Sequence, residues 1–339
     1  MSPPLLRIEG LQVEFDTPHG QVAGVRDAGL VVEAGEIVGL VGETGSGKTL
    51  ACRSVMRLIP YPGRIAAGRI EFEGRDVLRM SPRELREFRA HDVGMIYQDP
   101  FSSLNPVFRI GHQLTETLRA NLGLGKAEAR ARAVALLRDV GIPDPERRAL
   151  SYPHEFSGGM RQRVMIALAT ASNPRLLLAD EPTTALDVTT QAQILALLKR
   201  LNSEHGMGVL LVSHDFGVIA QVCDRVAVMY GGHIVETGPV EAIYTSAEHP
   251  YTCGLLESIP RIESAGQSTR LPVIDGVPPD PTERLPGCVF KPRCPYAQPD
   301  CDTVTMALEP VAPGHATACP VRPFRAANRT RSSRTGAQV

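Results

Sequence analysis

The stretch Gly42–Thr49 constrains the fold of this chain more than any other feature. Its residues, GETGSGKT, match the pattern G-x-x-x-x-G-K-[ST] without a mismatch. Glycines let the backbone curl so that successive N–H groups point toward a phosphate chain. Lys48 can reach the terminal phosphate oxygens, and the Thr49 hydroxyl can ligate Mg²⁺. An apolar run precedes the pattern and a helix-like segment follows it, as a phosphate loop between a strand and a helix requires. The predicted phosphate-binding residues are Gly42, Gly45, Ser46, Gly47, Lys48 and Thr49.

Length and composition narrow the class of protein further. The chain has 339 residues and is 43% hydrophobic, enough for two domains or for one large domain with an extension. Its net charge of −1 and the lack of a basic stripe argue against nucleic acid as the main partner. No apolar run approaches the ~20 residues of a membrane span, and the N-terminus lacks the pattern of a signal peptide. We therefore expect the chain to be made and kept in the cytosol, where its seven cysteines would not form structural disulfides.

Hydrophobic patterning predicts an α/β chain. Leu6–Phe15 alternates apolar and polar residues, and Val22–Val32 returns as a second strand. Phe15 either stacks on a nucleotide base or is an ordinary core side chain. Ile110–Leu122 and Ala127–Val140 have helical periodicity with no strand signal near them, which indicates a helical insertion. Ser81 is predicted to start another helix, with Pro82 at its first position and Glu84 closing a capping box.

Three apolar strands deliver polar side chains at their C-terminal ends. These side chains are Gln98, the neighbouring acids Asp180 and Glu181, and His214. In an α/β protein the C-terminal end of a strand is where ligands bind. Asp180 can hold Mg²⁺, and Glu181 can orient the attacking water and accept its proton. His214 could contact the γ-phosphate, although a lone histidine at such a position is more often a packing or capping residue.

A second anion site is predicted at Ser157-Gly158-Gly159, which open a helix with one hydroxyl and two bare backbone N–H groups. A chain that binds one nucleotide rarely needs two separate phosphate cradles. Either the two loops converge within the chain, or the second serves a neighbouring subunit.

Taken in order, these motifs resemble those of an ABC transporter ATPase. Gly42–Thr49 is similar to its Walker A loop and Gln98 to its Q-loop, Ser157–Gly159 resembles its signature, and Leu176–Glu181 is similar to Walker B with the catalytic glutamate. Ala185–Asp187 is similar to its D-loop and His214 to its switch histidine. The resemblance runs from about residue 5 to residue 322. Phe156 and Met160, where Leu and Gln are usual, are similar to the oligopeptide/dipeptide/nickel import subfamily, as is the segment His249-Pro250-Tyr251-Thr252.

The resemblance implies a P-loop NTPase (RecA-like) core with an antiparallel β subdomain, in an ATPase domain over 1–260 with a helical subdomain over about 100–172. It implies an ATP-hydrolysing subunit that energises peptide import. The catalytic residues would be Glu181, His214 and Gln98, and the Mg²⁺ ligands would be Thr49, Gln98 and Asp180. Phe15 would contact the nucleotide. Two ATPase domains would close head to tail around ATP, so that Ser157, Gly158 and Gly159 of one meet the nucleotide of the other.

The same resemblance implies the partners and the location. The partners would be a second ATPase subunit, two transmembrane permease subunits and an extracytoplasmic solute-binding protein. The chain would lie peripherally on the cytoplasmic face of the cell (inner) membrane. The sequence leaves open which solute is carried and whether the second ATPase is identical or a paralogue, and we favour a paralogue.

The composition shifts after Pro260. Residues 261–325 form a Pro- and Cys-rich extension, and 326–339 are expected to be a flexible basic tail. Four of the seven cysteines, Cys288, Cys294, Cys301 and Cys319, are spaced C-x5-C-x6-C-x17-C in this extension. Four thiolates in a loop-rich cytosolic segment favour a [4Fe–4S] cluster, with zinc or unliganded thiols as alternatives and His315 as an outside candidate ligand. Apolar periodicity is weak here, so we expect the metal to organise the extension and ATP binding to be independent of it. Cys52, Cys223 and Cys253 are expected to be packing residues.

Three other functions are consistent with parts of this pattern. The transported solute could be nickel or another small solute. The chain could be a soluble ABC ATPase in translation or DNA repair, but these usually carry two ATPase units or a long coiled-coil insertion. It could also be a regulatory metal-binding protein with a vestigial ATPase, which the complete catalytic set opposes.

Overall fold

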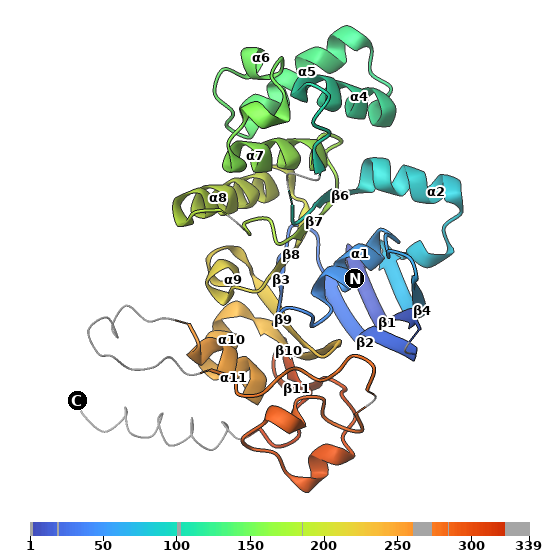
Figure 1. The fold of residues 1–339 in the computed structure, drawn as a ribbon, viewed down its shortest axis with the longest axis vertical. Coiled ribbons are helices and arrows are strands. Elements are labelled where there is room, and N and C mark those ends of the chain that lie inside the picture. Colours follow the sequence, from blue (N-terminus) through green and yellow to red (C-terminus); the bar gives the residue numbers. More distant parts are fainter. Residues whose placement is uncertain are drawn as a thin grey trace, which may run out of the picture. The chain divides into compact units, whose positions relative to one another are not determined.

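The computed structural model describes residues 3–18, 20–99, 103–184, 186–259, 273–283 and 285–322. The chain divides into two compact units. The first consists of Met1–Leu6, Val31–Ile37 and Glu71–Val212, and the second of Arg7–Leu30, Val38–Ile70 and Ser213–Val339. Figure 1 traces the chain from blue at the N-terminus to red at the C-terminus. Pro100, Ala185, the first part of the predicted extension (261–272) and the predicted tail (326–339) lie outside the described residues.

Three parallel strands form the sheet of the first unit. They are β6 (Val93–Ile96), β7 (Leu176–Asp180) and β8 (Gly208–Ser213), with Leu176 of β7 opposite both Val93 and Gly208. Every residue of these strands is buried. Such continuous apolar runs are typical of parallel strands that are covered on both faces. A short strand, β5 (Arg75–Asp76), pairs with Glu71 and Phe72 in the same unit.

Helices make up most of the rest of the first unit. They are α2 (Pro82–Glu87), α4 (Ile110–Leu122), α5 (Lys126–Asp139), α6 (Pro145–Arg148), α7 (Gly158–Ala169) and α8 (Val188–His205), with 3-10 turns at Val77–Arg79 and Pro153–Glu155 and a π turn at Phe88–Asp92. α4, α5 and α7 contact one another and α6 packs on α5, which is the predicted helical insertion (Figure 1). The predicted capping box is present, because Ser81 Oγ accepts the Glu84 N–H and Glu84 accepts the Ser81 N–H.

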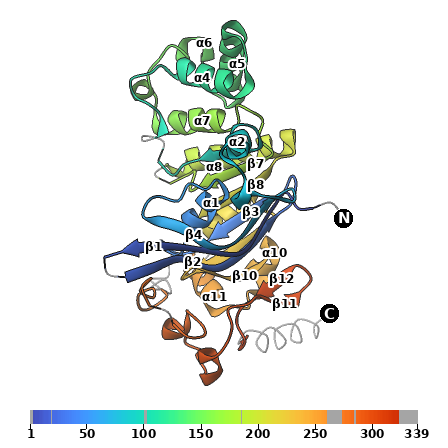
Figure 2. The same ribbon diagram turned by 90° about the vertical axis from the view of Figure 1, so that its right-hand side faces the viewer.

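The second unit contains an antiparallel group of strands and one end of a mixed sheet. β1 (Leu6–Thr17), β2 (Gly20–Val32) and β4 (Gly63–Phe72) lie side by side in the order β2-β1-β4 (Figure 2). β3 (Ile37–Val41) runs parallel to β9 (Arg225–Tyr230), and β9 is antiparallel to β10 (His233–Pro239). The helices of this unit are α1 (Lys48–Val55), α9 (Phe216–Val222), α10 (Val240–Ser246) and α11 (Pro250–Glu257).

The C-terminal extension joins this mixed sheet. β12 (His315–Thr317) pairs with β10, with Glu236 opposite Thr317, and β11 (Glu309–Ala312) pairs with β12. Two 3-10 turns, Lys291–Arg293 and Pro299–Asp302, precede these strands. The sequence pattern predicted no strand in this segment. Within the described residues, no helix is both long enough and apolar enough to cross a membrane.

Candidate active site

The predicted site residues are divided between the two units. The phosphate loop, Phe15 and His214 lie in the second unit, whereas Gln98, Asp180, Glu181 and the Ser157–Gly159 turn lie in the first. Each set is described within its own unit.

The phosphate loop connects β3 to α1, as the pattern predicts. Lys48 opens α1 and is buried, and its Nζ donates to the carbonyls of Gly42 (2.8 Å) and Glu43 (2.9 Å) and to Ser46 Oγ (3.4 Å). The loop carbonyls therefore hold the ammonium group inside the curl of the loop, where an incoming phosphate would meet a fixed positive charge.

Two glycines of this loop are required for steric reasons. A Cβ on Gly42 would lie 2.1 Å from the Met229 carbonyl oxygen, so any side chain there would collide with β9. Gly47 has a φ of 107° and its Cβ would lie 2.5 Å from the Gly24 carbonyl oxygen. Gly45 has a φ of 83° but faces open space, so only its backbone conformation favours glycine.

Phe15 lies near the end of β1 and is half-buried. Its ring packs beside two glycines: a Cβ on Gly63 would lie 2.5 Å from Phe15 Cε1, and one on Gly24 would lie 3.3 Å from Cε2. The ring is thus partly packed against the second unit and partly accessible.

In the first unit the ends of β6 and β7 meet at Glu181. The Gln98 amide donates to Glu181 Oε2 (3.2 Å), and the Thr184 hydroxyl donates to the same oxygen (2.8 Å). The Glu181 N–H donates to the Val212 carbonyl (3.1 Å). Asp180 is fully buried at the last position of β7. Two residues predicted from separate strands, Gln98 and Glu181, are therefore in contact.

The backbone at Glu181 is unusual. Its φ is 49°, in the left-handed region that a non-glycine residue rarely adopts. Conformations of this kind cluster at functional sites, where the surrounding hydrogen bonds hold them in place. The turn aims the Glu181 carboxylate at Gln98 and Thr184.

Ser157 is the N-cap of α7, and its hydroxyl accepts the Met160 N–H (3.3 Å). This hydroxyl is exposed, whereas the preceding Phe156 is buried with the Arg148 guanidinium 5.6 Å from its ring centre. A Cβ on Gly159 would lie 2.6 Å from Thr190 Cγ2, so glycine allows the close approach of α7 to α8. The turn thus presents an accessible helix N-terminus, as an anion site requires.

His214 follows β8 and is exposed. The next residue, Asp215, caps α9 by accepting the Gly217 N–H (2.7 Å). The histidine is therefore not the capping residue of this turn.

The extension contacts the phosphate loop inside the second unit. Arg293 makes a two-point ion pair with Glu43, with Nη1 at 2.8 Å from Oε2 and Nη2 at 3.2 Å from Oε1. Arg26 on β2 donates to the carbonyls of Pro281 (2.9 Å) and Glu283 (2.7 Å). The extension, which we expected to have no part in ATP binding, therefore contacts the phosphate loop directly.

The four predicted cysteine ligands line one small hollow, together with His249 and Phe290. Burial raises the pKa of the Cys288 thiol to about 11 and also raises the pKa of Cys294 and Cys319, and the neighbouring sulfurs add to the rise. His249 Nδ1 accepts the Tyr251 N–H (3.1 Å), and among the described residues its buried Nε2 has no hydrogen-bond partner. The donor set therefore matches a thiolate site in kind. In the described part of the chain, however, no three His, Cys, Asp or Glu side chains have the geometry of a metal site.

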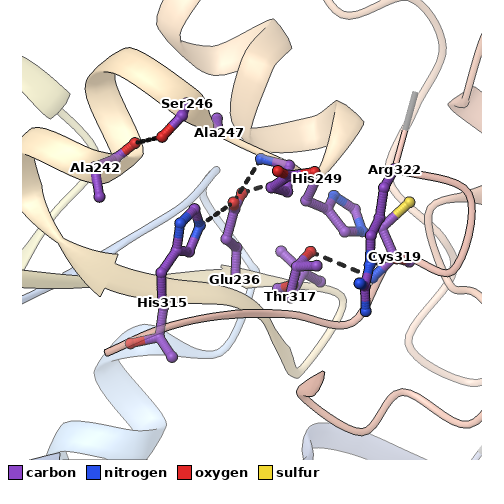
Figure 3. Close-up of polar contacts among 12 residues, drawn as sticks. Glu236, Ala242, Ser246, Ala247, His249, His315, Thr317, Cys319 and Arg322 are labelled. Atoms are coloured by element: carbon purple, nitrogen blue, oxygen red, sulfur yellow. Dashed lines mark hydrogen bonds and ion pairs between the residues drawn. The ribbon is translucent and has the colours of Figure 1, made fainter. Parts of the chain in front are cut away.

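His315 has a structural partner. It is buried on β12, and its Nε2 lies 2.8 Å from Glu236 Oε1 on β10 (Figure 3). The same carboxylate accepts the N–H groups of Glu248 (2.6 Å) and His249 (3.1 Å). His315 therefore anchors the extension to the sheet.

Comparison with known proteins identifies the family. Residues 25–184 match the family model for the ABC transporter, and residues 235–301 match the model described as the oligopeptide/dipeptide transporter, C-terminal region. The chain is 49% identical, over 86% of its length, to the oligopeptide transport ATP-binding protein OppD of Bacillus subtilis (strain 168), of which it covers 82%. This chain belongs to the ABC transporter ATPases, in their oligopeptide/dipeptide branch. It is also 46% identical to OppD of Salmonella typhimurium, with 93% of each chain covered.

Solved structures agree with this assignment. The ATP-binding cassette MJ0796, determined as a dimer in a post-hydrolysis state bound to ADP and Pi, is 26% identical with a TM-score of 0.63, covering 69% of this chain and 98% of that one. CbiO1 from Clostridium perfringens has the same fold, with a TM-score of 0.61 at 24% identity, covering 71% of this chain and 90% of that one. The predicted fold class and family are confirmed, and so is the interpretation of the subfamily.

Three residues of this ABC ATPase site were not found from the sequence. Thr184 holds Glu181, Tyr251 accepts the Glu43 N–H at 2.8 Å, and Arg293 pairs with Glu43. Thr184 stands three residues after Glu181, the predicted catalytic residue, so its position could have suggested it. Tyr251 and Arg293 lie more than 200 residues from the loop, and nothing near either residue in the sequence indicates its contact with Glu43.

Proposed function

We propose that this chain hydrolyses ATP to drive the import of peptides through a membrane transporter. The observation that carries the proposal is the 49% identity to a protein named for oligopeptide transport, which extends over the ATPase motifs and into the C-terminal region. A further relative, from Brucella abortus (strain 2308), is named a putative peptide import ATP-binding protein and is 46% identical over 94% of this chain. The partners would be a membrane permease complex, a second ATPase subunit and an extracytoplasmic solute-binding protein, with this chain peripheral on the cytoplasmic face.

The residues of the phosphate loop fit the binding of ATP. Lys48 presents a fixed ammonium group to the β- and γ-phosphates, and the backbone N–H groups of the loop line their path. Thr49, Gln98 and Asp180 would supply the oxygen ligands that Mg²⁺ prefers. Mg²⁺ bound there would neutralise charge that develops on the phosphate oxygens.

Glu181 is the proposed general base. Its carboxylate lies at the end of a buried strand and is oriented by Gln98 and Thr184, so that it can accept a proton from a water molecule that attacks the γ-phosphate. Gln98 would hold the base in place in this state, and His214 would contact the γ-phosphate from the end of β8.

The Ser157–Gly159 turn supports a composite site between two ATPase subunits. Ser157 is exposed and Gly158 and Gly159 are half-buried at the N-terminus of α7, where the helix dipole favours an anion. Such a turn could meet the nucleotide of a partner ATPase. The related cassette MJ0796 is a dimer in the structure bound to ADP and Pi.

The catalytic role of Glu181 is tested by Glu181→Gln. ATP binding should remain, because the phosphate loop is untouched. Hydrolysis should fall by about 10²–10⁴-fold, the usual effect of removing a positioned base. Glu87→Gln is the matched control, since Glu87 is exposed on α2 and forms an ion pair with Arg83 on the same helix. Near-normal turnover by the Glu181→Gln protein would remove the proposed role.

The transported solute is tested in a reconstituted transporter. The chain is assembled in proteoliposomes with candidate permease and binding-protein subunits from the same organism, and ATP turnover is measured with peptides or with Ni²⁺. Stimulation by peptides supports the proposal. Stimulation by Ni²⁺ alone would assign the chain to a metal importer, and turnover that needs no permease would favour a soluble ATPase.

We also propose that Cys288, Cys294, Cys301 and Cys319 ligate a [4Fe–4S] cluster. The four side chains line one hollow together with His249, whose buried Nε2 has no hydrogen-bond partner among the described residues, so a bound group with acceptor atoms could satisfy it. The raised thiol pKa values imply that the metal-free site is protonated, so that binding would release protons. Anaerobically purified protein should be brown and contain about four iron atoms per chain.

Single Cys→Ser substitutions give the matched comparison. Replacing any of the four cysteines should bleach the protein, whereas Cys52→Ser should not, because Cys52 is buried on α1. One zinc ion per chain without iron would replace the cluster with a zinc site. Metal-free protein with a protease-resistant extension would leave the four cysteines as packing residues.

A further inference from the structure

The two-point ion pair between Arg293 and Glu43 connects the C-terminal extension to the phosphate loop. Arg293 lies in the 3-10 turn Lys291–Arg293, and Glu43 is the second residue of the loop. The Arg293 side chain is only 6% exposed and that of Glu43 is 26% exposed, so solvent screens this pair far less than a surface pair.

Arg293 is held from both sides. Its Nε donates to the Asp275 carbonyl (2.9 Å), and Nη2 donates to the Ile274 carbonyl (3.0 Å). Nη1 also donates to the Tyr230 hydroxyl (3.3 Å) on β9. The guanidinium is therefore fixed in the extension and against the sheet, so it can act as a rigid support for the carboxylate of Glu43.

Glu43 connects Arg293 to the predicted phosphate-binding residue Lys48. Its carbonyl oxygen accepts Lys48 Nζ (2.9 Å), and its N–H donates to the hydroxyl of the buried Tyr251 (2.8 Å). The side chain of Glu43 is thus held by Arg293, while its backbone is held by Lys48 and Tyr251. A shift of Glu43 would move one of the carbonyls that position the ammonium group.

A separate chain of contacts joins the extension to the other side of the loop. Arg26 donates to the carbonyls of Pro281 and Glu283, and its N–H donates to the Gly232 carbonyl (2.8 Å). The Gly232 N–H in turn donates to the Ser46 carbonyl (3.0 Å). The extension is therefore tied to the phosphate loop at both Glu43 and Ser46.

We propose that Arg293 is a positioning residue for ATP binding: through Glu43 it holds the phosphate loop in its binding conformation. This inference rests on the proposed ATPase function. It assigns to the C-terminal extension a part in the nucleotide site of the same chain.

The test measures the equilibrium Kd of a fluorescent ATP analogue for the full-length protein. Arg293→Gln should raise the Kd about tenfold, within the range usual for coupling between two parts of one protein. Arg293→Lys keeps the positive charge but cannot form the two-point ion pair with Glu43, so its Kd should lie between those of the wild-type and Arg293→Gln proteins. Lys291→Gln is the matched control, because it removes one positive charge from the same turn where Lys291 pairs with Asp302. Its Kd should stay at the wild-type value.

Glu43→Gln separates positioning from simple electrostatics. Removing a negative charge beside the phosphates would tighten ATP binding by charge alone, whereas loss of the support should weaken it. The double variant Arg293→Gln/Glu43→Gln should bind no more weakly than Arg293→Gln alone if the two residues act as one unit.

The outcomes separate the inference from the function on which it rests. A wild-type protein that does not bind ATP would overturn the proposed function. If the wild-type protein binds ATP, an unchanged Kd in the Arg293→Gln protein would overturn the inference alone. Tighter ATP binding by the Glu43→Gln protein would do the same. The Tm of each variant shows that it is folded, and if Arg293→Gln does not fold, Glu43→Gln decides.

Discussion

Glu236→Gln should destabilise the attachment of the C-terminal extension. Glu236 lies on β10 with no exposed surface, and its carboxylate accepts three hydrogen bonds. Two come from the backbone N–H groups that lead into α11, and the third comes from His315 on β12 (Figure 3). One side chain therefore joins the sheet, a helix and the extension.

The size of the effect follows from the geometry of the glutamine. Glu236 Oε1 serves Glu248 and His315, and Oε2 serves His249. A glutamine amide has one oxygen, so even in its better orientation its NH₂ group faces the His249 N–H. One hydrogen bond to a charged group is then lost, worth about 1.5–3 kcal/mol, and the other two become neutral and weaker. We expect the unfolding free energy to fall by about 2–4 kcal/mol.

Urea unfolding monitored by circular dichroism measures this loss, and limited proteolysis shows whether the extension is cleaved first. Glu309→Gln is the control, because Glu309 on β11 is 71% exposed and its pair with Arg322 should contribute only about 0–1 kcal/mol. A Glu236→Gln protein as stable as the Glu309→Gln protein would refute the reasoning.

Three further predictions concern the nucleotide site. Gly42→Ala should abolish ATP binding in a fluorescence titration, because its Cβ would lie 2.1 Å from the Met229 carbonyl oxygen. Gly45→Ala should weaken the free energy of ATP binding by only ~1–2 kcal/mol, the cost of a left-handed backbone at a non-glycine residue. Equal effects of the two substitutions would contradict the steric argument. The Ser157→Arg protein and the Lys48→Ala protein should each lack ATPase activity. If the dimer is homomeric, a mixture of the two should regain the activity of at most one composite site per dimer. Wild-type ATPase activity of the Ser157→Arg protein alone would remove the case for a contact in trans. Thr184→Val should lower kcat for ATP several-fold with little change in KM, because it removes a hydrogen bond that orients the base rather than the base itself; an unchanged kcat would show that Gln98 alone suffices.

Local signals in the sequence predicted the parts of the fold that are decided locally. The helix Ile110–Leu122 has the predicted bounds, and the capping box at Ser81 is present, because both depend on residues within a few positions of one another. The buried runs of β7 and β8 were found because a strand that is covered on both faces is apolar throughout. The phosphate loop was found because its steric demands leave few alternatives at Gly42 and Gly47.

The sequence could not predict what depends on distant residues. The first half of β4, which begins at Gly63, carries no local strand signal, because it is only partly buried and shows no alternation of apolar and polar residues. β12 has three residues, and its burial depends on Glu236, which lies 79 positions earlier. Arg293 and Glu43 are separated by 250 positions. No pattern within the extension indicates that its arginine reaches the phosphate loop.

The contacts of the extension also change what holds it together. We expected a metal to organise this segment, since it has too few apolar residues for a core of its own. In the structure, however, Phe290 is buried against Tyr230 and Tyr251 of the ATPase core, with ring centres 5.2 and 5.4 Å away. Three further contacts hold the extension: the pairing of β12 with β10, the buried pair of His315 with Glu236, and the ion pair of Arg293 with Glu43. The extension therefore packs on the hydrophobic core of the second unit. If the proposed cluster is bound, its loss should loosen the cysteine-lined hollow while β12 stays on the sheet.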